Sequence, residues 1–120
     1  MLIVEDDADI RELVAFKLRQ VGYDVRTAGN GEEGLQLAVD TPPDVVILDL
    51  MMPKLSGLEV CRELRSNDDT ATIPIIMLTA KAQEADVERG FELGATDYVI
   101  KPFSPRELVS RVQAALGRTA

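Results

Sequence analysis

The run VVILD at residues 45–49 is apolar throughout until it ends at an aspartate. A strand with one face in water alternates polar and apolar residues, whereas a strand covered on both faces stays apolar. The run therefore predicts a buried strand of a parallel sheet. Two similar runs, at residues 1–4 and 75–78, are also followed at once by a polar residue, Glu5 and Thr79 respectively.

Segments with helical periodicity separate these runs. Between residues 8 and 20 apolar side chains recur every three or four positions, and Gly22 lies just beyond the last of them. The same reasoning along the chain predicts helices at 8–20, around 35–39, around 58–65, around 87–91 and around 108–116, and strands at 1–4, 23–28, 45–48, 75–78 and 98–100. This alternation predicts an α/β fold in which a five-stranded parallel sheet carries helices on both faces, as one domain over residues 1–120.

The composition excludes several classes of function. Asp and Glu number 21 against 13 Lys and Arg, and the basic residues are scattered, so this segment is not expected to bind nucleic acid or anionic membranes. The single cysteine, Cys61, cannot form an internal disulfide and is expected to pack in the core, which indicates a reduced, cytoplasmic setting. The chain has no histidine, which leaves carboxylates, Lys, Thr and a hard cation to carry any chemistry.

The carboxyl ends of parallel strands meet at one edge of the sheet, where ligands of such folds bind. In this chain the predicted strand ends deliver Glu5, Asp6, Asp49, Thr79 and Lys101 to that edge. Two carboxylates about 4 Å apart repel by roughly 4 kcal/mol at an effective dielectric near 20, so a cation is expected among them. Mg²⁺ favours oxygen ligands, and a carboxylate nucleophile beside a divalent cation, a lysine and a hydroxyl suits phosphoryl transfer to an aspartate.

These residues resemble the receiver domains of two-component response regulators. The resemblance covers nearly the whole chain and is carried by LIVEDD at 2–7, VILDLMMP at 46–53, MLTA at 77–80, GATDY at 94–98 and KPF at 101–103. It implies a doubly wound, flavodoxin-like (βα)5 fold with strand order 2-1-3-4-5. It also implies a phosphorylation-dependent signalling switch, served by a sensor histidine kinase, rather than a metabolic enzyme.

The resemblance assigns roles by position. Asp49 is the expected phosphoacceptor, Thr79 and Lys101 are expected to assist it, and Thr79 and Tyr98 are expected to form the switch. The expected Mg²⁺ ligands, with Mn²⁺ as an alternative ion, are Glu5, Asp6, Asp49 and the backbone carbonyl of Met51, with Asp6 the more direct ligand and Glu5 acting through water. The Lys101–Pro102 peptide bond is expected to be cis.

The stretch PFSPREL at 102–108 is most similar to the branch in which a winged-helix DNA-binding domain follows the receiver, the OmpR/PhoB type. The resemblance implies such an output domain beyond residue 120, and a homodimer when phosphorylated, formed through the fourth helix, fifth strand and fifth helix. Candidate contributors to that surface are Arg89, Glu92, Asp97, Glu107, Arg111 and Arg118. Thr96 departs from the branch, which commonly has a second acid there.

Met51 and Lys81, at the positions that tune hydrolysis, predict a moderately long-lived phosphorylated state.

Two other functions compete with this interpretation. GNGEEG at 29–34 matches the dinucleotide-binding pattern through Gly29, Gly31 and Gly34, but two glutamates at the helix start would repel a pyrophosphate, which favours a turn and helix cap. The other competitor is a receiver-like interaction module that no longer accepts phosphate; the complete set of polar residues at the sheet edge argues against it. Asp7 and Asp9 are expected to serve the start of the first helix.

Overall fold

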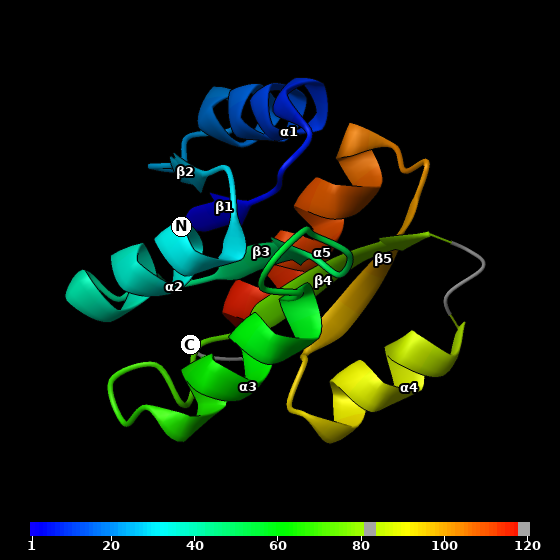
Figure 1. Ribbon diagram of the computed structural model, residues 1–120. Helices are drawn as coiled ribbons and strands as arrows, with labels where there is room; N and C mark the ends of the chain where they lie inside the picture. Colours follow the sequence, from blue (N-terminus) through cyan, green and yellow to red (C-terminus); the bar gives the residue numbers. More distant parts are fainter. Residues whose placement is uncertain (81–83, 118–120) are drawn as a thin grey trace.

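The computed structural model describes residues 1–80 and 84–117. Strands and helices alternate along the chain (Figure 1). The strands are β1 (Leu2–Val4), β2 (Arg26–Ala28), β3 (Val46–Asp49), β4 (Ile75–Ala80) and β5 (Asp97–Lys101). The helices are α1 (Ala8–Gln20), α2 (Gly31–Asp40), α3 (Gly57–Ser66), α4 (Glu84–Glu92) and α5 (Pro105–Gly117).

All neighbouring strands pair in parallel, in the order β2-β1-β3-β4-β5. The predicted fold class and strand order are therefore confirmed. Register aligns the strand ends, because Val4 pairs with Leu48, Leu48 with Met77, and Ala80 with Lys101. The polar residues that end β1, β3, β4 and β5 consequently meet at one edge of the sheet.

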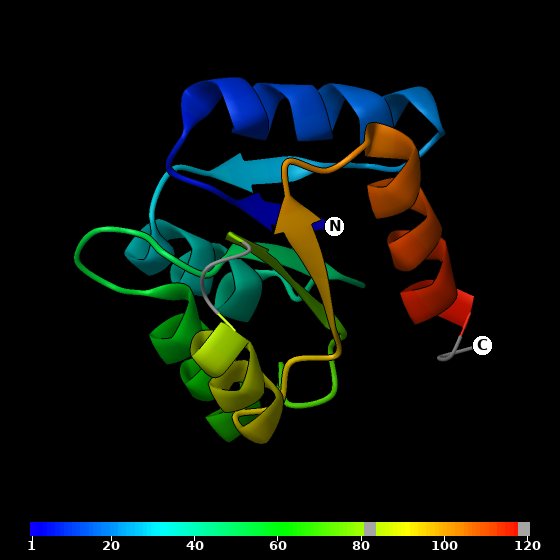
Figure 2. The same cartoon turned by 90° about the vertical axis from the view of Figure 1, so that its right-hand side faces the viewer.

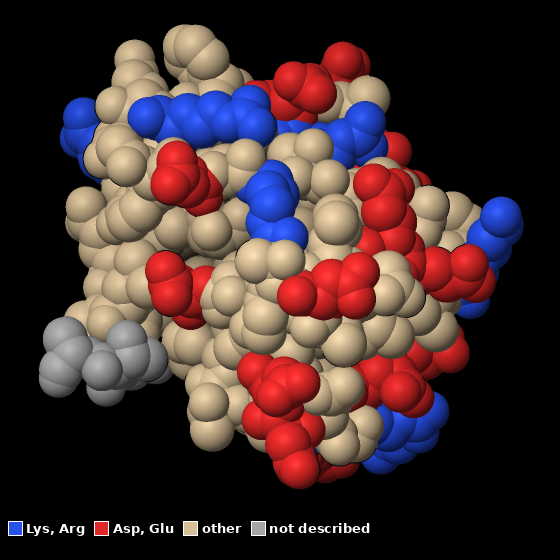
Figure 3. All heavy atoms as spheres, turned by 90° about the vertical axis from the view of Figure 1, so that its left-hand side faces the viewer, with Lys and Arg blue, Asp and Glu red and all other residues tan. Residues whose placement is uncertain are grey.

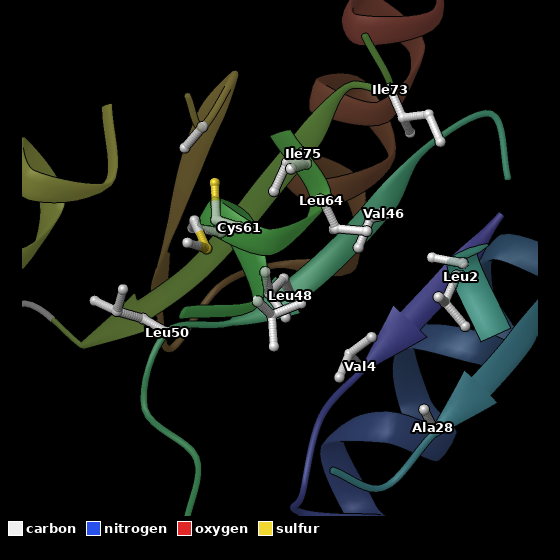
Figure 4. Packing of buried hydrophobic residues seen from close by; sticks show 14 of the residues in the cluster. Leu2, Val4, Ala28, Val46, Leu48, Leu50, Cys61, Leu64, Ile73 and Ile75 are labelled. Carbon is white, nitrogen blue, oxygen red and sulfur yellow. The ribbon is translucent and has the colours of Figure 1, made fainter. Parts of the chain in front are cut away.

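Two apolar cores cover the two faces of the sheet. Val46 and Leu48 point to the face covered by α2 and α3, whereas Ile47 points to the face covered by α1 and α5. Figure 2 shows α1 and α5 on the opposite side of the sheet from α2, α3 and α4, and Figure 4 shows the packing of the first core. Burial on both faces explains why β3 lacks polar alternation. Cys61 is fully buried in the first core, as predicted, and burial raises the pKa of its thiol.

The predicted strand at 23–28 is too long, since β2 begins only at Arg26. The preceding residues belong to the end of α1: Gly22 adopts a φ of 101°, and the backbone N–H of Tyr23 donates to the carbonyl of Leu18 at 3.1 Å. Tyr23 and Val25 then pack against the core under α1. Their apolar character reflects this packing rather than strand pairing.

Local hydrogen bonds start the helices where the sequence indicates. Asp7 caps α1 by accepting from the N–H groups of Asp9 and Ile10, and Asp9 lies in the first turn. At the start of α5, the Ser104 hydroxyl oxygen accepts from the N–H of Glu107 at 3.0 Å. A capping box, Ser56 with Glu59, begins α3. These caps supply partners for N–H groups that the first turn of a helix leaves unpaired.

The surface carries mixed charge. On the face shown in Figure 3, Asp and Glu side chains are spread widely and Lys and Arg side chains are interspersed among them. Acidic side chains predominate on most of this face, which agrees with the net charge of −8. Among the described residues, no helix combines the length and apolar character that a membrane crossing requires.

Candidate functional site

Three carboxylates meet at the carboxyl edge of the sheet. Glu5 and Asp6 follow β1 and Asp49 ends β3, and one carboxylate oxygen of each lies within 4.8 Å of the others. Glu5 is fully buried, Asp49 is 5% exposed, and Asp6 is open to solvent. The predicted acidic cluster is therefore assembled, with two carboxylates below the surface and one at the mouth.

Lys101, at the end of β5, neutralises part of this cluster. Its Nζ lies 2.9 Å from Glu5 Oε1 and 3.3 Å from Asp49 Oδ1. Burial lowers the pKa of Lys101, but the hydrogen bond to Glu5 and the charge of Asp49 outweigh it, so that the pKa lies above its ordinary value. Lys101 is thus held as a cation between two acids. The peptide bond that follows it, Lys101–Pro102, is cis as predicted.

Glu5 is the most perturbed acid of the site. Burial and the neighbouring Asp49 raise the pKa of Glu5 to about 8, although Lys101 opposes the shift. Its Oε2 is buried and has no hydrogen-bond partner among the described residues. A buried carboxylate oxygen without a partner is costly, and a hard cation is the partner that three converging oxygens fit. The donor set therefore suits Mg²⁺.

Met51 lies beside Asp49, in the loop that follows β3. Its backbone N–H donates to Asp49 Oδ1 at 3.3 Å, while its side chain is 56% exposed. This places the predicted carbonyl ligand two residues after Asp49, the last residue of β3. The exposed methionine side chain is not part of either core.

Thr79 and Tyr98 emerge on the same face of the sheet. Thr79 is buried at the end of β4, and its Oγ1 donates to the carbonyl of Ala80 at 3.3 Å. Tyr98 pairs in register with Met77, two residues before Thr79. The Tyr98 ring packs against Phe91 of α4, with ring centroids 4.6 Å apart. Thr79 thus reaches the acidic edge, whereas Tyr98 lies further along the sheet, under α4.

Two residues that support the site were not predicted from the sequence. Arg11 of α1 donates from Nη1 to the backbone carbonyl of Glu5 at 2.9 Å, which ties the loop after β1 to α1. Gly57, at the start of α3, packs so closely against the backbone of Asp49 that a methyl group there would overlap the Asp49 carbonyl oxygen. The sequence signals only a helix start near Gly57 and a charged helix position at Arg11.

The glycines at 29–34 serve packing. Asn30 caps α2 by accepting from the N–H of Glu33 at 2.8 Å. A Cβ at Gly31 would stand 2.6 Å from the carbonyl oxygen of Leu55, and one at Gly34 would stand 2.5 Å from a Val4 methyl group. The turn-and-cap interpretation accounts for Gly31 and Gly34 without a dinucleotide.

Four of the residues predicted for a dimer surface form ion pairs within the chain. Arg111 lies 3.2 Å from Asp97 and Arg89 lies 3.6 Å from Glu92. Thr96, which departs from the branch pattern, accepts the N–H of Ile75 at 3.0 Å and so joins the residue before β5 to the first residue of β4. Arg118 of this surface, and Lys81 of the pair expected to tune hydrolysis, lie outside the described residues.

Comparison with known proteins agrees with this geometry. Residues 1–113 match the family model of the response regulator receiver domain. The chain is 55% identical over 119 residues to the probable transcriptional regulator ycf27 of Guillardia theta, and 49% identical over 119 residues to the phosphate regulon transcriptional regulatory protein PhoB of Pseudomonas aeruginosa. Each match covers 99% of this chain but only 46% and 52% of the relatives, so the chain spans about half their length.

The fold is also shared with a solved structure of a related protein. A putative response regulator from Chloroflexus aurantiacus superposes with a TM-score of 0.92 at 44% identity, over 97% of this chain and 95% of that chain. The relatives named as transcriptional regulators confirm the resemblance to the OmpR/PhoB type. The chain belongs to the family of response regulator receiver domains.

Proposed function

We propose that Asp49 accepts a phosphoryl group from the phosphohistidine of a sensor histidine kinase, and that the modification switches the output of a transcriptional regulator. The observation that carries the proposal is the convergence of Asp49 with Glu5, Asp6 and Lys101 at one edge of the sheet. Two buried carboxylates are kept together there by a lysine, and the third carboxylate, that of Asp6, is open to solvent.

Mg²⁺, or Mn²⁺ in its place, would be held by Glu5, Asp6, Asp49 and the carbonyl of Met51. When bound, the ion would neutralise charge on the phosphoryl oxygens and on the carboxylates. Asp6 is the exposed member of the set and suits direct coordination, whereas Glu5 is already engaged by Lys101 at 2.9 Å. This division supports the expectation that Glu5 acts through water.

In the transfer itself, an Asp49 carboxylate oxygen attacks phosphorus in line. The new O–P bond forms as the N–P bond of the donor breaks, and the electron pair of that bond returns to the imidazole ring. Lys101, 3.3 Å from Asp49 Oδ1, offsets the added negative charge. The Thr79 hydroxyl, at the end of the neighbouring strand, donates to a phosphoryl oxygen. The chain is thus a switch that catalyses its own modification rather than an enzyme that turns over a metabolite.

Phosphorylation then acts on a pre-existing equilibrium between two conformations. Thr79 moves toward the phosphoryl group and Tyr98 follows, which changes the surface formed by α4, β5 and α5. We infer that this surface mediates homodimerisation and controls a C-terminal DNA-binding domain. The proposal is supported by relatives that are named transcriptional regulators and are about twice as long as this chain.

Incubation with acetyl phosphate and Mg²⁺, read by intact mass, tests the proposal. The wild-type chain should gain one phosphoryl group, and Asp49→Asn should gain none. Asp44→Asn is a matched control, because Asp44 is exposed and lies before β3, away from the acidic cluster. If the wild type forms no adduct, the chain is an interaction module without phosphorylation; if Asp49→Asn forms it equally well, Asp49 is not the acceptor.

A further inference from the structure

Gly90, within α4, faces the ring of Tyr98 on β5. A methyl group at Gly90 would overlap the Tyr98 hydroxyl oxygen and stand 2.9 Å from Tyr98 Cζ, closer than carbon atoms approach without displacement. Both atoms belong to the far end of the tyrosine ring. The ring therefore occupies the volume that any other side chain at position 90 would need.

Space, rather than backbone conformation, explains this glycine. Glycine inside a helix costs about 1 kcal/mol relative to alanine, so it needs a compensating reason. Gly90 is not among the described glycines with positive φ, which are Gly22 and Gly94. It is buried, and the described atoms nearest to an added methyl group belong to Tyr98 and Leu58.

The next residue of α4 contacts the same ring. The ring centroids of Phe91 and Tyr98 lie 4.6 Å apart, and the two ring planes are tilted by 57° to one another. Two consecutive residues of α4 thus define where the ring lies. Figure 2 shows α4 and β5 as successive elements joined by a short turn, so a shift of α4 and a rotation of Tyr98 involve the same few residues.

We propose that Gly90 is the positioning residue for Tyr98: the notch that it leaves in α4 admits the inward ring, and a side chain there would drive the ring out. The inference rests on the proposed function, in which Thr79 and Tyr98 relay phosphorylation. It adds that the position of α4 controls Tyr98 as directly as Thr79 does. Any residue larger than glycine at position 90 should therefore uncouple Tyr98 from the acidic cluster.

A graded series of double variants tests the steric claim on the unmodified protein. Gly90→Ala should lower Tm when Tyr98 is present, lower it less in a Tyr98→Phe background, and raise it by about 3–5 °C in a Tyr98→Ala background, where only the gain in helix propensity remains. Gly117→Ala is the control, because no described residue lies within 4 Å of its added methyl group and its effect should not depend on residue 98. An equal change of Tm by Gly90→Ala in all three backgrounds would overturn the proposal.

Nuclear magnetic resonance of the Tyr98 ring distinguishes a positioning role of Gly90 from an effect on stability alone. The chain has two tyrosines, so Tyr23→Phe assigns the Tyr98 ring resonances. In the wild type, nuclear Overhauser contacts should join the Tyr98 ring to the α protons of Gly90. In Gly90→Ala, the contacts of the Tyr98 ring with residue 90 and Phe91 should be lost. If these contacts persist, the claim that the space left by Gly90 admits the ring is wrong.

The same samples, treated with acetyl phosphate and Mg²⁺, link the notch to the switch. Gly90→Ala should form the phosphoryl adduct as the wild type does, but its Tyr98 resonances should no longer respond to the adduct. Equal responses in the two proteins would overturn the role of Gly90 in the switch. Absence of the adduct from both proteins would instead contradict the proposed function, and the Tm series and ring contacts would then decide the steric claim alone.

Discussion

Lys101 Nζ donates to Glu5 Oε1 at 2.9 Å, across 96 positions of sequence, and joins the end of β5 to the end of β1. The carboxylate that it contacts is fully buried. Replacing Lys101 by Met should therefore leave buried acids without their cation and lower the free energy of unfolding by about 1–3 kcal/mol in the absence of divalent ions. Urea denaturation in the presence of a chelator measures this change in the free energy of unfolding.

Lys17→Met is the matched control for that change. Lys17 is partly exposed, and the one hydrogen bond that its Nζ makes among the described residues is to Gln20 at 3.3 Å, so replacing it should change stability by less than about 0.5 kcal/mol. Saturating Mg²⁺ should restore part of the stability lost in Lys101→Met. Equal losses in the two variants would show that the Lys101 contacts contribute nothing to stability.

The raised pKa of Glu5 makes stability depend on pH. Glu5 titrates near 8 in the folded chain and near its ordinary value of 4.5 when unfolded, so the folded state binds the proton more tightly. Its contribution to stability is complete below about pH 4.5 and is lost as the pH rises through about 8. In metal-free buffer the free energy of unfolding should fall between about pH 5 and 8.5, and Glu5→Gln should flatten that fall. An unchanged slope in Glu5→Gln would assign the dependence to another group.

Mg²⁺ should raise the thermal stability of the chain, because it binds the native state selectively. At a concentration about 100 times its dissociation constant, the increase is about 2.7 kcal/mol. Asp6→Asn should reduce this increase, since Asp6 is the exposed ligand at the mouth of the cluster. Asp9→Asn, an exposed acid three residues further along, is the control. An unaltered metal response in Asp6→Asn would remove Asp6 from the site.

The phosphorylated chain should be moderately long-lived. Met51 carries no group that could orient an attacking water, and its side chain points into solvent with 56% of its surface exposed. After removal of acetyl phosphate, intact mass at successive times should show the adduct decaying well beyond the scale of seconds. Loss within seconds would contradict this prediction.

Lys54 adopts a φ of 68°, which is the left-handed region, in the loop between β3 and α3. A side chain in that region costs about 1–2 kcal/mol, part of which glycine recovers. Lys54→Gly should therefore raise the free energy of unfolding by about 0.5–1 kcal/mol, and Lys54→Val should lower it. Chemical denaturation of the two variants tests the difference in sign; a loss of stability in Lys54→Gly would show that Lys54 makes compensating contacts.

Local patterns were sufficient to predict most of the fold. The run at 45–49 is apolar because both faces of β3 are covered, so burial is visible in the residues themselves. The same logic failed at 23–25, where side chains pack on the core beneath α1 without joining a strand. Apolar character reports burial, whereas strand pairing also requires backbone partners, and periodicity over three residues cannot tell the two apart.

The residue types at the strand ends, and the edge on which they meet, follow from the sequence because parallel strands share one direction. Which of these side chains contact one another does not follow from the sequence. The contact of Lys101 with Glu5, the bond from Arg11 to the Glu5 carbonyl, and the close approach of Gly57 to Asp49 depend on register and on sub-ångström packing between distant segments. The fit of Tyr98 against Gly90 is of the same kind: neither residue alone reveals it, because the space that a missing side chain leaves is defined only by the neighbour that fills it.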